Sequence, residues 1–99
     1  MAFAAAFASQ SAVAADMEVG KHKAVKCMAC HGLDGIAEVS SWPNIAGQKE
    51  EYLIKQLHAF RDGERQDPAM QPMVRTLTEK DIQDLAAYYS NLGPGACHR

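Results

Sequence analysis

The sequence predicts a small all-α domain. Three segments place apolar residues at helical spacing, and no segment alternates polar and apolar residues strongly enough to indicate a strand. Two loops, at residues 32–47 and 63–76, separate these segments and contain glycine and proline. The chain has 99 residues, which is room for one core. We therefore expect a single domain with three main helices.

The N-terminal segment indicates export. Its first fifteen residues carry no charged side chain and end in Ala12-Val13-Ala14-Ala15, which is typical of a signal-peptide cleavage site. The basic residues that normally precede such a stretch are missing, so a start further upstream and an alanine-rich first helix stay open as alternatives. We expect a signal peptide at residues 1–15, cut after Ala14 or Ala15, and an exported, periplasmic domain at residues 16–99.

The composition argues against two classes of protein. The net charge of −2 lacks the basic excess that is typical of nucleic-acid-binding proteins. No apolar run reaches the roughly 18 residues of a transmembrane helix, so we expect no transmembrane segment. The domain that remains after cleavage has about 84 residues. At that size a core made of protein alone is thin, and a metal or cofactor is a common supplement.

The first helical segment leads into the most informative residues of the chain. Met17, Gly20, Ala24 and Cys27 recur at helical spacing, so we expect one helix that carries Cys27 near its end and stops at Gly32. Its more polar side is either a docking patch or a solvated helix face, and it consists of Lys21, Lys23 and Lys26.

Two further helices are expected downstream. The second runs from about residue 48 to residue 62, and Gly63 is placed to end it. The third begins after Thr78, which forms a capping box with Asp81, and it is closed by Gly93 and Pro94. Their apolar faces consist of Leu53, Leu57 and Phe60 in the second helix and of Ile82, Leu85, Ala86 and Tyr89 in the third.

The pentapeptide Cys27-Met28-Ala29-Cys30-His31 is a motif for covalent haem attachment. The thiols of Cys27 and Cys30 can each form a thioether bond with one haem vinyl group, and His31 then lies under the iron as an axial ligand. A zinc site would need a second set of ligands at paired spacing, and a redox-active dithiol would be expected in a βαβ context. The sequence contains neither pattern, so we predict one haem c, which would also supply the missing apolar centre.

The second axial ligand of the iron has two candidates in the loop before the last helix, Met70 and Met73. A methionine thioether is a soft donor, and His/Met ligation raises the reduction potential of a haem iron. That loop contains two prolines, and it can cross the far face of the haem.

The chain resembles the short bacterial class I cytochromes c, and in particular one haem domain of the dihaem cytochromes c. The resemblance covers nearly all of residues 16–92. The haem motif is its specific part, and the order of several looser motifs supports it. These are Gly20, Trp42-Pro43-Asn44-Ile45-Ala46-Gly47-Gln48, Tyr52-Leu53-Ile54-Lys55-Gln56-Leu57, Met70-Gln71-Pro72-Met73, Leu77-Thr78, Asp81-Ile82 and Leu85-Ala86-Ala87-Tyr88-Tyr89.

The resemblance implies roles for residues around the iron. Met70, eight residues before Thr78, matches the axial methionine. Met73 is then expected to pack against the haem. Pro43, twelve residues after His31, matches a proline whose carbonyl accepts the His31 ring N–H. Such a bond fixes the tautomer of the ring and raises its basicity.

Further positions have roles that are implied less directly. Gly20 matches a small residue where the first and last helices cross, with Tyr88 or Tyr89 as its partner. Trp42 either lines the haem edge or a propionate, or it only covers the core. His58 lies off the apolar face of its helix and is expected to be a solvated histidine and not a distal ligand.

The function that the resemblance implies is electron transfer by a class I cytochrome c fold wrapped around one haem c. With both axial positions filled, the iron cycles between ferric and ferrous states without binding a substrate, so we predict an electron carrier and not an enzyme. We expect a monomer that docks briefly with redox protein partners. Cys97 is then a free tail thiol, although an exported odd cysteine can also pair between chains.

Two alternatives from other classes stay open. One is a haem enzyme or gas sensor with an open sixth position, which would follow if Met70 does not bind the iron. The other is an electron-transfer subunit held in a larger dehydrogenase or oxidase.

Overall fold

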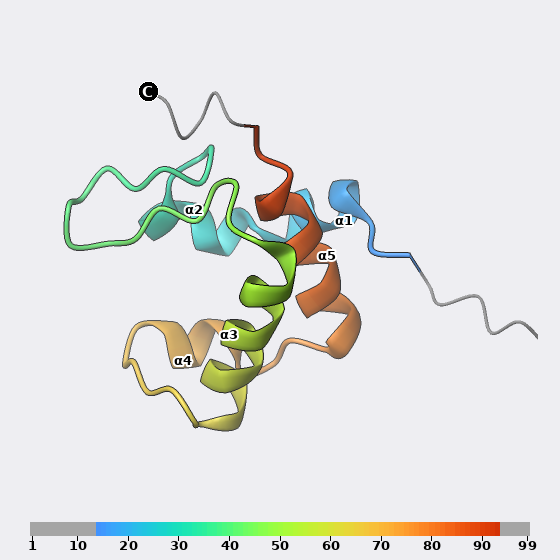
Figure 1. The fold of residues 1–99 in the computed structure, drawn as a ribbon. Helices are drawn as coiled ribbons and strands as arrows, with labels where there is room; N and C mark the ends of the chain where they lie inside the picture. The colour runs from blue at the N-terminus through green and yellow to red at the C-terminus, as the bar shows by residue number, and fades with distance from the viewer. Residues whose placement is uncertain (1–13, 94–99) are drawn as a thin grey trace, which may run out of the picture.

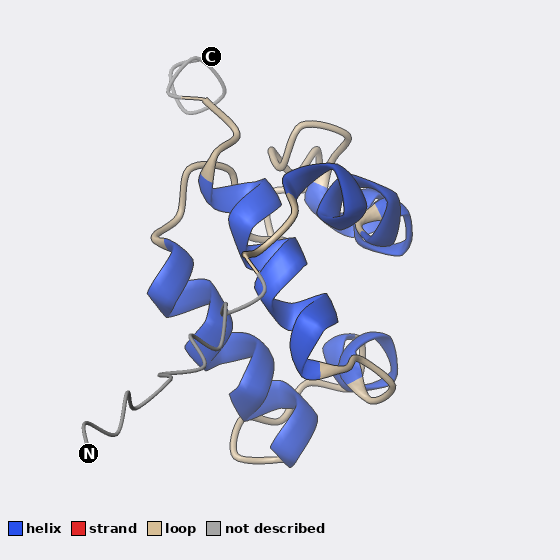
Figure 2. Ribbon diagram, turned by 90° about the vertical axis from the view of Figure 1, so that its right-hand side faces the viewer, coloured by secondary structure: helices blue, strands red, loops and turns tan. Residues whose placement is uncertain are grey.

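The computed structural model describes residues 14–93, which form five helices and no strand (Figure 1, Figure 2). In chain order these are α1 (Met17–Lys23), α2 (Val25–His31), α3 (Glu50–Asp62), α4 (Met70–Val74) and α5 (Glu79–Ser90). The predicted all-α class is therefore confirmed. None of the helices in this part of the chain is long and apolar enough to cross a bilayer. Most of the expected signal peptide, together with Pro94 and Cys97, lies outside the described residues.

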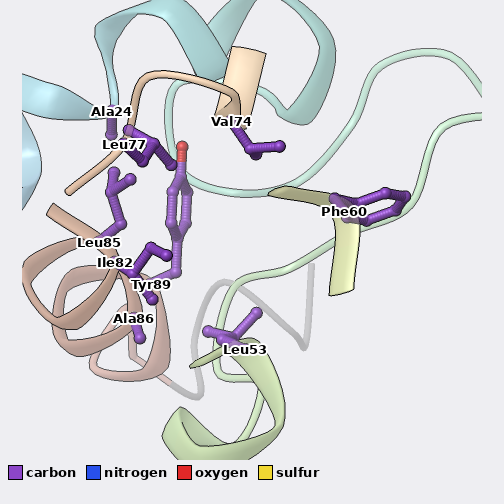
Figure 3. Packing of buried hydrophobic residues seen from close by; sticks show 9 residues of the cluster. All are labelled: Ala24, Leu53, Phe60, Val74, Leu77, Ile82, Leu85, Ala86 and Tyr89. Carbon is purple, nitrogen blue, oxygen red and sulfur yellow. The ribbon is translucent and has the colours of Figure 1, made fainter. Parts of the chain in front are cut away.

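The C-terminal helix α5 organises the molecule. Both α1 and α3 pack against α5, and α4 packs against α3 (Figure 1, Figure 2). The predicted apolar face of this helix is buried, and Leu53 and Phe60 of α3 are buried with it. Together they form most of one core cluster, which Figure 3 shows: Ala24, Leu53, Phe60, Val74, Leu77, Ile82, Leu85, Ala86 and Tyr89.

The expected first helix is divided at Ala24. The Ala24 carbonyl accepts hydrogen bonds from the N–H groups of both Cys27, at 2.8 Å, and Met28, at 3.1 Å. The first of these bonds spans only three residues, which tightens one turn and separates α1 from α2. Apolar spacing does not record such a local change of pitch, so it predicts a continuous helix where the chain forms two.

The crossing of α1 and α5 depends on Gly20. A Cβ atom at this position would lie 2.1 Å from the Asp84 carbonyl oxygen and 2.9 Å from Tyr88 Cβ. Glycine is therefore required for the close approach of the two helices. Of the two partners expected for Gly20, Tyr88 is at the crossing, whereas the Tyr89 side chain belongs to the core cluster.

A buried carboxylate joins α5 to the start of α1. Asp84 is fully buried, and its Oδ1 accepts hydrogen bonds from the Asp16 N–H at 2.8 Å and from Lys80 Nζ at 2.6 Å. Burial opposes the charge on Asp84, but the contacts with Lys80 and Asp16 outweigh it and hold the pKa of this carboxyl below its usual value. Lys23 of α1 forms a second ion pair, with Asp81.

Local side-chain hydrogen bonds set both ends of α5. The predicted capping box is present, because Thr78 Oγ1 accepts from the Asp81 N–H at 3.1 Å and Asp81 Oδ2 accepts from the Thr78 N–H at 3.0 Å. The helix ends at Ser90, earlier than Gly93 predicts. Asn91 Nδ2 donates to the Ala87 carbonyl at 2.8 Å, which caps the last turn before the glycine is reached.

The loop before α5 contains a short helix that the sequence pattern does not predict. Asp67 Oδ1 accepts hydrogen bonds from the N–H groups of Ala69, at 2.8 Å, and Met70, at 3.0 Å, and so holds the turn that leads into α4. Pro72 fits because it lies in the first turn, where a backbone N–H has no intrahelical partner. α3, in contrast, ends as predicted at Gly63, which has a left-handed conformation with φ of 81°.

Candidate haem-binding site

His31 is the last residue of α2 and is buried, with 7% of its surface exposed. Its Nδ1 lies 2.9 Å from the Pro43 carbonyl oxygen, so the expected contact between these two residues is present. Gly32 has φ of 85°, and a Cβ atom there would lie 1.9 Å from the Ile36 carbonyl oxygen. The chain therefore turns sharply after His31, which directs the following loop back over the histidine ring.

Backbone hydrogen bonds hold the loop that carries Pro43. The Gly35 carbonyl accepts from the N–H groups of Ile45, at 2.9 Å, and Ala46, at 3.1 Å. The Gly47 N–H donates to the Tyr89 carbonyl at 2.9 Å and ties the end of this loop to α5. The position of the Pro43 carbonyl thus follows from a loop that is fixed at both of its ends.

Cys27 and Cys30 are both free, half-buried thiols on α2. Residues three apart lie on the same side of a helix, so the two sulfur atoms face a common region. Cys27 packs against the core cluster, and burial raises the pKa of its thiol. Attachment at these two positions would join a planar group to the protein beside its core cluster.

The two methionine candidates differ in their surroundings. Met70 begins α4, is half-buried and packs against the same core cluster as Cys27. Met73 lies one turn later and is 40% exposed. The structure therefore brings Met70, and not Met73, toward the apolar region that Cys27 borders.

Trp42 precedes Pro43 in the loop and is 43% exposed. It is not among the described residues that form or border the core cluster. Two roles are expected for Trp42, which are to line the haem edge or a propionate and to cover the core. The structure gives no support to the second.

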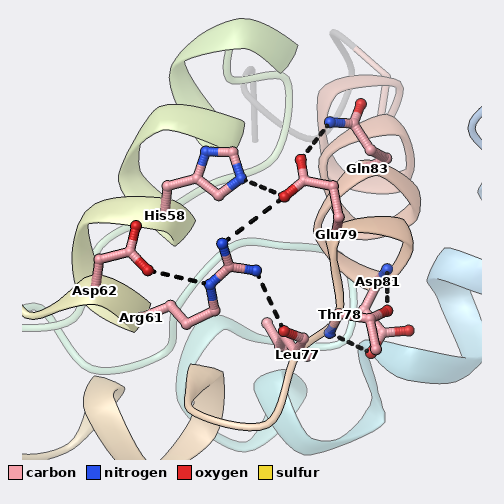
Figure 4. A network of polar contacts seen from close by, with 8 residues as sticks. All are labelled: His58, Arg61, Asp62, Leu77, Thr78, Glu79, Asp81 and Gln83. Carbon is pink, nitrogen blue, oxygen red and sulfur yellow. Dashed lines mark hydrogen bonds and ion pairs between the residues drawn. The ribbon is translucent and has the colours of Figure 1, made fainter.

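The polar residues between α3 and α5 form a separate network (Figure 4). His58 donates to Glu79 at 2.7 Å, and this bond lowers the pKa of the Glu79 carboxyl. Arg61 lies 3.8 Å from Glu79 and donates to the Leu77 carbonyl at 3.4 Å. The His58 side chain is 33% exposed, which agrees with the expected contact with solvent. It also joins two helices, a contact that the sequence does not predict.

Two buried side-chain oxygens of the described residues have no hydrogen-bond partner, Asp84 Oδ2 and the Tyr89 hydroxyl. The Tyr89 hydroxyl is buried within the cluster, and it lies beside the Cys27 sulfur. The sequence places Tyr89 on an apolar helix face and does not predict that its hydroxyl is buried there. A tyrosine on such a face is itself the signal, because its hydroxyl needs a hydrogen-bond partner when buried. The described residues contain no cluster of His, Cys, Asp or Glu that could hold a metal ion alone.

These features fit a haem and not a bare metal ion. The Cys27 thiol and Met70 border one apolar cluster, and Cys30 and the oriented His31 follow Cys27 on α2. A buried hydroxyl beside Cys27 lacks a hydrogen-bond partner. The sequence model of the family described as cytochrome c matches residues 17–93, which include all of them. The chain belongs to the cytochrome c family. Membership implies covalently bound haem c with iron and a function in haem-based electron transfer.

Individual relatives agree with this assignment. A cytochrome c4 of Pseudomonas aeruginosa is 41% identical to this cytochrome c over 78 residues, which are 79% of this chain and 39% of that protein. Cytochrome c-554(548) of Halomonas halodenitrificans is 42% identical over 81 residues, which are 79% of this chain and 98% of that protein. An electron acceptor of thiosulfate dehydrogenase from Thiomonas intermedia is 40% identical over 73 residues, covering 73% of this chain and 34% of that protein.

The fold agrees with solved structures as well. Reduced recombinant cytochrome c4 from Pseudomonas stutzeri has a TM-score of 0.74 at 38% identity, and the match covers 78% of this chain and 45% of that one. This cytochrome c spans about half or less of the length of the cytochrome c4 relatives, from 39% to 52%. That extent agrees with the resemblance to one haem domain of a dihaem cytochrome.

Proposed function

We propose that this cytochrome c is a periplasmic electron carrier whose haem is held by Cys27 and Cys30 and ligated by His31 and Met70. The observation that carries the proposal is the buried His31, which directly follows the two thiols and has its ring oriented by a backbone carbonyl. When bound, the haem supplies a one-electron couple between ferric and ferrous iron.

Pro43 has a specific part in this proposal. A carbonyl oxygen can only accept a hydrogen bond, so the 2.9 Å contact requires the proton of the neutral ring to be on His31 Nδ1. The other ring nitrogen, Nε2, is then free to coordinate a metal, and the bond to Pro43 makes it more basic. Pro43 would thus act as a positioning residue for the histidine ligand.

Met70 would complete the ligand set from α4. Its half-buried position beside the core cluster favours it over the more exposed Met73. With histidine and methionine both bound, no position remains for a substrate or a gas, which supports a carrier and argues against an enzyme or sensor. The packed side chains around the site would also keep structural change between the two redox states small.

Export and transient docking belong to the same proposal. The uncharged N-terminal segment and its Ala12-Val13-Ala14-Ala15 ending support a signal peptide that directs the chain to the periplasm. There the protein would exchange electrons with redox partners through a small, short-lived interface.

Substitution of the two methionines tests the ligand assignment. We expect Met70→Ala to abolish the weak sulfur-to-iron absorption band of the ferric protein and to open the iron to cyanide, because the only soft ligand is removed. Met73→Ala is the matched control, and it should keep the band and resist cyanide. Absorption spectra of both variants with and without cyanide decide the matter, and the reverse pattern would mean that Met73 is the ligand.

A second candidate function is that of a dedicated electron acceptor or subunit of a dehydrogenase. The similarity to the thiosulfate dehydrogenase electron acceptor of Thiomonas intermedia favours it. The two candidates differ in their assembly, because a carrier is monomeric when purified whereas a subunit remains with its enzyme. Size-exclusion chromatography of protein isolated from its native cells separates them.

A further inference from the structure

Tyr89 places a polar group at the point where the cofactor would be attached. Tyr89 is 4% exposed, and its buried hydroxyl has no hydrogen-bond partner among the described residues. The Cys27 sulfur is a neighbour of this hydroxyl. In Figure 3 the Tyr89 ring stands within the core cluster, with the hydroxyl oxygen at its far end. A buried hydroxyl without a partner is costly, so a nearby acceptor is required.

The position of Tyr89 is well fixed. Its carbonyl accepts the Gly47 N–H at 2.9 Å, and its ring meets that of Tyr88 edge to face, with the ring centroids 5.1 Å apart. The flanking Ala86 and Leu85 of α5 are almost completely buried. The hydroxyl is therefore held beside Cys27 by the packing of α5 and has little freedom to turn toward solvent.

The chemistry of the sulfur decides the direction of the hydrogen bond. A free Cys27 thiol is both a weak donor and a weak acceptor, whereas a thioether sulfur can only accept. Burial also raises the pKa of the Tyr89 phenol, so the hydroxyl keeps its proton. Once Cys27 is joined to the haem, the phenol is the only possible donor of the pair.

We propose that the Tyr89 hydroxyl donates a hydrogen bond to the thioether sulfur of Cys27 and thereby raises the reduction potential of the protein. The positive end of the O–H dipole then faces the attached group and favours its more electron-rich, reduced state. This inference rests on the attachment of haem at Cys27 in the proposed function. It assigns to Tyr89 a further role, which is to set the reduction potential, beside the residues that hold the cofactor.

Potentiometry of Tyr89→Phe tests the proposal, because this change removes one oxygen atom and keeps the ring. We expect the equilibrium constant of reduction to fall about threefold. For a one-electron couple, where a tenfold change corresponds to 59 mV, this lowers the midpoint potential by about 28 mV. Tyr88→Phe, the same change one residue earlier, is the matched control and should leave the potential unchanged. An unchanged potential in Tyr89→Phe, with the sulfur-to-iron band intact, would overturn the proposal.

A second measurement on the unmodified protein keeps the proposal testable if Tyr89→Phe does not mature. In the reduced protein, NMR should detect a slowly exchanging Tyr89 hydroxyl proton with a nuclear Overhauser effect to the Cys27 β protons. A Tyr89 hydroxyl proton that exchanges rapidly, or that lies near other protons only, would contradict it. Haem that is released by acidified acetone would instead refute the attachment itself, so failure of the proposed function is recognised separately.

Discussion

At the scale of single residues, Asp84 links a buried charge to the placement of the first helix. It is the only charged side chain among residues 14–93 that is completely buried, and it bonds both Lys80 and the backbone of Asp16. A carboxylate in such a place stabilises the fold only while it is ionised and its partners stay in reach. The stability of the α1–α5 contact should therefore depend on pH.

We expect Asp84→Asn to lower the free energy of unfolding by about 1–2 kcal/mol at neutral pH, because Lys80 loses its charged partner. The native pKa of Asp84 lies below its ordinary value, so the stabilisation is complete above about pH 4 and is lost as the pH falls through the native value. The difference between Asp84→Asn and the wild type should thus shrink in acid.

Urea unfolding of the haem-loaded protein across an acid pH series measures this difference. Asp62→Asn is the control, because Asp62 is an exposed carboxylate that pairs with Arg61 on the surface of α3, and its loss should cost well under about 1 kcal/mol. A difference between Asp84→Asn and wild type that stays constant from neutral to acid pH would show that the charge of Asp84 is not what stabilises the contact.

Residue-scale prediction from the sequence succeeds where the chemistry is local. Cys27, Cys30 and His31 are adjacent in the chain, so their motif is readable without the fold. The pairing of His31 with Pro43 comes from a family resemblance and is present in the structure. The Tyr89 hydroxyl and the buried pairing of Asp84 could not be predicted, because each depends on which side chains of other helices lie beside α5.

At the scale of helices, the crossing of α1 and α5 is the contact most sensitive to side-chain size. Gly20 brings the backbone of α1 against that of Asp84, with no room for a Cβ atom. Sequence analysis places a small residue at this crossing, and the structure agrees. It does not predict the division at Ala24 or the short α4, because a tightened turn and the side-chain hydrogen bonds of Asp67 leave no apolar periodicity.

Gly20→Ala tests the crossing. The added methyl group would meet the Asp84 carbonyl oxygen at 2.1 Å, so the two helices must move apart, and we expect the free energy of unfolding to fall by about 1–3 kcal/mol or more. Gly93→Ala is the control, because a Cβ atom at Gly93 has no neighbour within 4 Å. Thermal unfolding followed by circular dichroism compares them, and equal stability of the two variants would refute the close contact.

At the scale of the whole molecule, segments distant in the sequence border one apolar cluster. Cys27 approaches it from α2 and Met70 from α4, while α5 supplies four of its nine buried residues. The surface of α1 and α2 carries fewer free lysines than the sequence suggests, because Lys23 pairs with Asp81, whereas Lys21 and Lys26 remain exposed. Any attraction of an acidic partner to this face would therefore depend on those two residues.

The central claim of this account is that Cys27 and Cys30 bind one haem covalently. Intact-mass spectrometry under denaturing conditions tests it most directly on protein produced with a bacterial cytochrome c maturation system, because a thioether-bound haem stays on the unfolded chain whereas a haem held only by its ligands is lost. We predict one species with the mass of the chain from Ala15 or Asp16 plus one haem. Loss of the haem from the unmodified chain on denaturation would contradict the account. So would a haem that stays bound when Cys27 and Cys30 are replaced and is lost only when other residues are replaced.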